Sequence, residues 1–145
     1  MNNLKYIEKC PYCNSDVIYV DSIKIYRKSH GMIYLCSDYP LCMSWVGVHS
    51  GTNYPLGRLA NNELRKLKSE VHSWFDPIWK YLIKHKNQSK YKARNSTYQW
   101  LAFKMNIDID DCHIGMFDVK QCKEAIIIIK EFYKNKNNLI KFKNE

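Results

Sequence analysis

The stretch "CPYCNSDVIYVDSIKIYRKSHGMIYLCSDYPLC", residues 10–42, decides the fold of the first part of this chain. It holds four of the six cysteines, as two pairs that enclose two and five residues and lie 22 residues apart. Two ligands on one tight turn can reach the same tetrahedral ion, and a hairpin can return a second pair to complete the shell. The spacing therefore predicts one metal site made by Cys10, Cys13, Cys36 and Cys42.

An all-sulfur tetrahedral site suits Zn²⁺ best, with an iron centre as the rarer alternative. Buried or redox-active thiols are the other interpretation, and His30 or His49 lies close enough in the sequence to replace a cysteine. Four thiolates leave no position for water or substrate, so the predicted Zn²⁺ holds the fold and does no chemistry.

Around these cysteines the chain is rich in β-branched and aromatic residues, which favour strands. The expected strands are residues 17–20, 23–26, 33–35 and 44–48. Lys28 to Gly31 reads as a turn in which Gly31 takes a positive φ. The sequence thus predicts a zinc ribbon over residues 1–50, followed by a connector over residues 51–58.

The pattern changes to a helical period in residues 59–134, which we expect to form a domain of three to four helices. Asn61 suits a helix N-cap, and Asp76-Pro77 predicts that a first helix ends near Phe75 and a second begins at Pro77. A third helix is expected over residues 89–105, and a fourth starts with a capping box of Asp118 and Gln121. Residues 135–145 read as a frayed basic tail.

The expected fold class is therefore α+β, with the ribbon packed on the helical bundle. The N-terminus has no apolar leader, and the longest purely apolar run, residues 125–129, is far too short to span a bilayer. We expect a cytoplasmic protein with no membrane partner and no small-molecule substrate. A reducing compartment favours metal over disulfides for closely paired cysteines.

The knuckles "CPYC" (residues 10–13) and "CSDYPLC" (residues 36–42) resemble the zinc ribbons repeated at the C-terminus of bacterial type IA topoisomerases. Those ribbons bind single-stranded DNA, so the resemblance implies nucleic-acid contact here. It covers the ribbon alone, and nothing in the chain resembles the catalytic domains of those enzymes.

Two further stretches, "YPLGRLANNELRKLKSEVHSWFDPIWK" (residues 54–80) and "CHIGMFDVKQC" (residues 112–122), resemble a family of small phage and prophage proteins. That family is known as a zinc-finger-containing domain of unknown function. The resemblance covers about residues 10–126. It implies a fold and a phage setting, and therefore the cytoplasm of a bacterial host, and it implies no reaction.

A second candidate metal set consists of Cys112, His113 and Cys122 with His72 or His49. The alternative is that Cys122 belongs to the buried stripe of the last helix and that His113 bonds to the backbone. Asp108, Asp110 and Asp111 could hold Mg²⁺, although such a patch is more often a solvated loop. The chain has no P-loop, GxSxG or HExxH motif, so we expect no enzymatic activity.

The formal net charge is +9, and residues 77–107 contain no acidic residue. Cations interleaved with aromatic residues are typical of single-strand binders, although a lysine-rich surface also serves solubility. The predicted contacts to nucleic acid or a partner are Arg27, Lys28, His30, Lys84, Lys86, Lys90, Lys92 and Arg94. The alternative is a protein–protein inhibitor of a host nucleoprotein machine, of the anti-CRISPR type, that blocks a Cas nuclease or its DNA loading.

Overall fold

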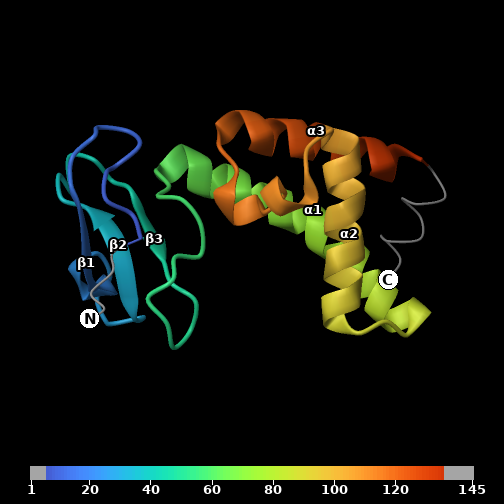
Figure 1. Cartoon of the computed structure of the whole chain (residues 1–145), viewed down its shortest axis with the longest axis horizontal. Coiled ribbons are helices and arrows are strands. Elements are labelled where there is room, and N and C mark those ends of the chain that lie inside the picture. Colours follow the sequence, from blue (N-terminus) through green and yellow to red (C-terminus); the bar gives the residue numbers. More distant parts are fainter. Residues whose placement is uncertain (1–5, 136–145) are drawn as a thin grey trace. The chain divides into compact units, whose positions relative to one another are not determined.

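The computed structural model describes residues 6–135, which form two compact units with their boundary between Arg65 and Lys66. The first unit carries a small sheet and the second is helical, which confirms the predicted α+β class (Figure 1). Within the described part of the chain, no helix is both long enough and apolar enough to cross a membrane. Residues 136–145 of the predicted tail lie outside the described residues.

Three antiparallel strands form the sheet of the first unit, in the order β1-β2-β3. They are β1 (Val17–Asp21), β2 (Met32–Cys36) and β3 (Trp45–Gly47). Val17 pairs with Cys36 at one end of the first ladder, so β2 ends where the second cysteine pair begins. The antiparallel pairing of β1 and β2 thereby brings the second cysteine pair back beside the first, as the cysteine spacing predicts.

The predicted strand over residues 23–26 is wrong. Residues Ser22–Lys24 form a single 3₁₀ turn, η1, inside the loop that joins β1 to β2. The Asp21 carboxylate accepts a hydrogen bond from the Ile23 amide at 2.9 Å, and the buried Ser22 hydroxyl accepts one from the His30 amide at 2.7 Å. These side chains give the backbone partners other than a neighbouring strand, and they outweigh β-propensity. Gly31 has φ of 101°, as the turn predicts.

The core of this unit forms around one cysteine of each pair, together with β1 and β2. Cys10, Val17, Tyr34, Cys36 and Leu59 are almost completely buried and form one cluster. The Tyr34 hydroxyl donates to the Asn53 carbonyl at 2.6 Å, which ties the expected connector to the sheet. The connector also folds back on β3, through bridges that pair Val48 with Pro55 and Trp45 with Ala60.

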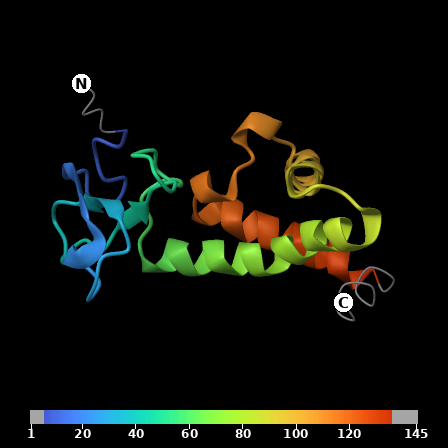
Figure 2. The ribbon, with the colours of Figure 1, turned by 90° about the horizontal axis from the view of Figure 1, so that it is seen from below.

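Helix α1 (Asn62–Lys86) is continuous with Pro77 inside it, so the predicted break at Asp76-Pro77 is wrong; Figure 2 shows α1 as one long helical ribbon. Asn61 caps its start as expected, because its side chain accepts from the Leu64 amide at 2.9 Å. Asp76 is no cap, since its carboxylate accepts from the indole N–H of Trp79 at 3.0 Å. Burial continues past the proline at Ile78 and Trp79, both 8% exposed. That burial outweighs the cost of about 3 kcal/mol for an interior proline.

Pro77→Ala is expected to stabilise the helical unit by about 1–3 kcal/mol, because alanine restores the missing backbone hydrogen bond. Chemical denaturation followed by far-UV circular dichroism measures this change. Gln99→Ala, an exposed position within a helix, is the matched control and should change the stability by less than about 0.5 kcal/mol. A destabilised Pro77→Ala protein would instead show that Pro77 opens a separate helix.

Two more helices complete the second unit, α2 (Lys90–Met105) and α3 (Val119–Lys134). Ser89 caps α2, and Asp118 with Gln121 forms the predicted capping box of α3. Between them lie the 3₁₀ turns η2 (Ile109–Asp111) and η3 (Ile114–Met116). The buried face of the unit gathers apolar residues from all three helices and from the segment before α3: Val71, Phe75, Leu101, Phe117, Cys122 and Ile129.

Candidate metal centre

Two tight turns place the four thiols of the first unit. In the first turn, the Asn14 amide donates to the Cys10 carbonyl at 2.9 Å, and Asn14 takes a positive φ of 64°. In the second, the Cys42 amide donates to the Asp38 carbonyl at 3.1 Å. Each turn also aims one amide at a sulfur, from Tyr12 to Cys10 Sγ and from Asp38 to Cys36 Sγ, both at 3.4 Å. These two amide donors stabilise negative charge on the sulfurs of Cys10 and Cys36.

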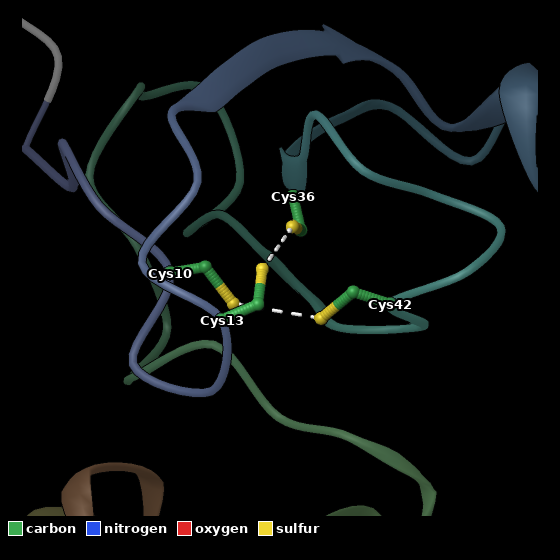
Figure 3. Close-up of side chains that lie close together, drawn as sticks. All are labelled: Cys10, Cys13, Cys36 and Cys42. Carbon is green, nitrogen blue, oxygen red and sulfur yellow. Dashed lines mark hydrogen bonds between the residues drawn. The ribbon is translucent and has the colours of Figure 1, made fainter.

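The four sulfurs converge on one point (Figure 3). They lie within 4.8 Å of one another, with Cys10 Sγ 3.7 Å from Cys42 Sγ and Cys13 Sγ 3.4 Å from Cys36 Sγ. A tetrahedral ion with Zn–S bonds of about 2.3 Å would separate its sulfurs by about 3.8 Å. The cluster has the donors and the size for one Zn²⁺, so the predicted cofactor is confirmed.

Two serine hydroxyls lie within hydrogen-bonding distance of the thiols. Ser44 is fully buried, and its Oγ lies 3.2 Å from Cys10 Sγ and 3.6 Å from Cys42 Sγ. Ser15 Oγ lies 3.2 Å from Cys13 Sγ. A hydroxyl can donate to a thiolate, so these serines can orient and stabilise metal-bound sulfurs. The cysteine spacing gave no sign of them, although both lie two residues after a cysteine.

The thiols differ in their acidity when no ion is bound. Hydrogen bonds from Ser15 lower the pKa of Cys13 to about 7. Burial raises the pKa of Cys36 to about 12 and raises that of Cys42 above its usual value. Buried thiolates at neutral pH thus require a cation, and binding it releases protons.

The histidines near the ribbon do not join the site. The His30 and Tyr26 rings are nearly perpendicular with centres 5.2 Å apart, and His49 stacks on the Tyr54 ring at 5.8 Å. Over residues 6–135, the four cysteines are the only set of three or more His, Cys, Asp or Glu side chains close enough to share an ion. The metal site therefore uses cysteine alone.

The second candidate set is not brought together. Cys112 and Cys122 are fully buried, and burial raises the pKa of each thiol to about 11. His113 is exposed beside the Tyr98 ring, while His72 Nδ1 lies 3.4 Å from a carboxylate oxygen of Asp76. These cysteines are part of the apolar core of the helical unit. In the acidic patch, Asp108 caps η2 by accepting from the Asp110 amide at 3.0 Å.

The predicted contact residues fall in both units. Arg27, Lys28 and His30 are exposed in the loop between β1 and β2. The others are exposed at the end of α1 and the start of α2: Lys84, Lys86, Lys90, Lys92 and Arg94. The predicted contact set leaves out Trp79 and Lys80, a lysine of the same basic stretch, and these two residues join Lys90 and Arg94 in a cation cluster. Lys80 Nζ, Lys90 Nζ and Arg94 Cζ lie 5.7, 5.6 and 5.8 Å from the centre of the Trp79 ring.

A three-stranded antiparallel sheet with two cysteine knuckles and a closed four-sulfur site defines a zinc ribbon, here followed by three helices. The chain belongs to the family of zinc-finger-containing domains whose profile matches residues 6–132, which confirms the family that the sequence resembles. No curated protein and no solved structure matches the chain.

Proposed function

We propose that this protein is a non-enzymatic, zinc-stabilised nucleic-acid-binding protein. The observation that carries the proposal is the Trp79 cluster, made of Lys80, Lys90 and Arg94 around one indole ring. All three cations are exposed, whereas Trp79 is only 8% exposed. Three exposed positive charges thus lie within about 6 Å of the centre of one buried ring.

The charges of the Trp79 cluster are not neutralised locally. Among the described residues, none of Lys80, Lys90 and Arg94 takes part in an ion pair. The nearby carboxylate of Asp76 accepts from the indole N–H and faces His72. Exposed cations without an ion-pair partner suit the closely spaced phosphates of a nucleic acid, because their binding releases the counterions held by those phosphates.

The metal centre supports this role by fixing the ribbon. Four thiolates complete the shell of Zn²⁺ and leave no open position for a reacting group, so the ion supplies structure. The setting that we propose, a phage or prophage protein in the bacterial cytoplasm, rests on the sequence resemblance.

The test is a salt series of gel shifts or fluorescence anisotropy with labelled DNA and RNA. Lys90→Ala/Arg94→Ala should weaken binding at low salt at least about tenfold and reduce the slope of log K against log[salt] by about 1.5–2, because two phosphate contacts are lost. Lys120→Ala/Lys123→Ala is the matched control, since it removes two exposed charges from α3 of the same unit. It should change affinity by about twofold at most.

A wild-type protein that shifts no nucleic acid at low salt would refute the proposal. Pull-down from host lysate, with and without nuclease, then tests the inhibitor alternative. A host complex that still binds after nuclease treatment, with wild-type affinity for the Lys90→Ala/Arg94→Ala protein, would indicate protein docking.

A further inference from the structure

A groove of about 570 Å³ lies on the first unit. Its walls come from the β1–β2 loop, from β3 and from the hairpin after it, and they include Tyr26, His30, Trp45, Val48, Thr52 and Leu56. The volume falls in the range of about 300–1,000 Å³ that small-ligand sites occupy. None of the described Asp or Glu residues lines it, so the described walls are aromatic, aliphatic and hydroxyl-bearing without negative charge.

The wall that carries Tyr26 is held rigidly. The Tyr26 amide donates to the Ser22 carbonyl at 2.9 Å, and the Ser22 amide donates to the Gly31 carbonyl at 2.9 Å. The Ser29 hydroxyl donates to the Asp21 carboxylate at 2.9 Å. The hydrogen-bonded loop therefore fixes the backbone of an aromatic residue that remains exposed to solvent, since Tyr26 is 44% exposed. A fixed, exposed aromatic residue at a groove is a feature of binding surfaces.

The Tyr26 ring has no parallel ring partner among the described residues. His30 and Trp45 both meet it at nearly right angles, with interplanar angles of 89° and 90°. Within residues 6–135, no other ring contact of Tyr26 occurs. Trp45 is different, because the Arg65 guanidinium covers one of its faces at 3.6 Å. Tyr26 is thus a partly exposed ring of the groove that is not engaged in parallel stacking, as a stacked heterocycle would require.

Positive charge lies directly beside this ring in the sequence. Arg27 and Lys28 follow Tyr26 in the chain, both are exposed, and neither forms an ion pair with any described residue. The carboxylate nearest in sequence, Asp21, is occupied by the Ser29 hydroxyl and the Ile23 amide. A ligand that stacks on Tyr26 and carries an adjacent anion therefore finds complementary charge.

The edge of the sheet argues against an extended peptide as that ligand. A peptide that adds to a sheet needs free backbone groups on an edge strand. The edge at β3 is already used, because Trp45 pairs with Ala60 and Val48 pairs with Pro55. At this edge the groove presents aromatic rings with cations close by in the chain, and few free backbone hydrogen-bonding groups.

We propose that this groove receives an unpaired base of single-stranded nucleic acid, stacked on Tyr26, with its phosphate facing Arg27 and Lys28. Duplex bases are stacked on one another and cannot enter, so the site prefers single strands. This inference rests on the proposed function and adds the single strand as the form that the ribbon recognises.

The test measures anisotropy of a labelled single strand of about eight nucleotides and of the matching duplex, with the zinc-loaded full chain. Tyr26→Ala should weaken single-strand binding about tenfold, leave duplex binding unchanged and leave the salt slope unchanged, because stacking releases few ions. Tyr26→Phe keeps the ring and should bind like the wild type. Tyr54→Ala, a 55% exposed tyrosine of the same unit outside the groove, is the matched control and should also bind normally.

Arg27→Ala/Lys28→Ala provides an independent readout at exposed positions whose loss should not disturb folding. It should reduce the single-strand salt slope by about 1–1.5, in contrast to Tyr26→Ala. Zinc content and thermal unfolding confirm that each variant is folded. A wild type that binds neither strand would overturn the proposed function. Wild-type binding with an equal affinity of Tyr26→Ala for the single strand, or an equal loss for both strands, would overturn only the base site.

Discussion

Cys36→Ser is expected to abolish zinc binding and to unfold the first unit. Cys36 ends β2, is fully buried and lies 3.4 Å from Cys13 Sγ, so its sulfur belongs to both the metal shell and the core. Structural zinc contributes roughly 10–16 kcal/mol in small domains, which equals or exceeds the net stability of most folded proteins. Metal analysis should fall from one zinc per chain to none, and near-UV circular dichroism of the ribbon aromatics should collapse.

The matched control is Cys122→Ala, which removes a buried thiol outside the metal cluster. It should lower the stability of the helical unit while the zinc content stays at one per chain. Strong chelation of the wild type should reproduce the Cys36→Ser spectrum. A metal-free protein with native circular dichroism and an unchanged melting temperature would contradict the assignment of the zinc as the main stabiliser of this unit.

Phe75→Ala should destabilise the helical unit by about 3–5 kcal/mol, the second large effect. Phe75 is completely buried in α1, and its ring lies 4.6 Å from the Tyr98 ring of α2. Truncation leaves a cavity at the contact between two helices and removes an aromatic pair. Chemical denaturation followed by far-UV circular dichroism measures the loss.

Phe103→Ala is the control for this change, since the side chain lies on α2 and is 80% exposed. It should alter stability by no more than about 0.5 kcal/mol. Zinc content should remain at one per chain in both phenylalanine variants. Loss of zinc from Phe75→Ala would show that the two units do not hold their structures separately.

Local patterns predicted the parts of the fold that depend on neighbouring residues. Asn61 and Asp118 cap their helices as predicted, because a short polar side chain reaches a backbone amide only three residues away. Gly31 takes its positive φ because glycine has no Cβ to clash with the backbone. Interactions of this range do not depend on the rest of the fold.

The errors arose where distant residues outweighed local preference. The break expected at Pro77 is absent because Phe75, Ile78 and Trp79 are buried on one continuous helix. The strand expected at residues 23–26 is absent because Ser22 and Asp21 bond to the far end of their loop, at His30 and Ser29. In both cases the deciding contacts link residues that no local pattern pairs.

The sequence by itself determined the metal centre, because knuckle spacing fixes which sulfurs a turn can present, and a four-sulfur donor set selects Zn²⁺. Only the tertiary structure decided which residues surround it and which surfaces remain for binding. Ser44 meets two of the thiols, Lys80 and Arg94 meet over Trp79, and Tyr26 keeps an unstacked ring at a groove. The physical reason is that metal ligation is specified within short turns, whereas a binding surface is specified by side chains that only packing brings together.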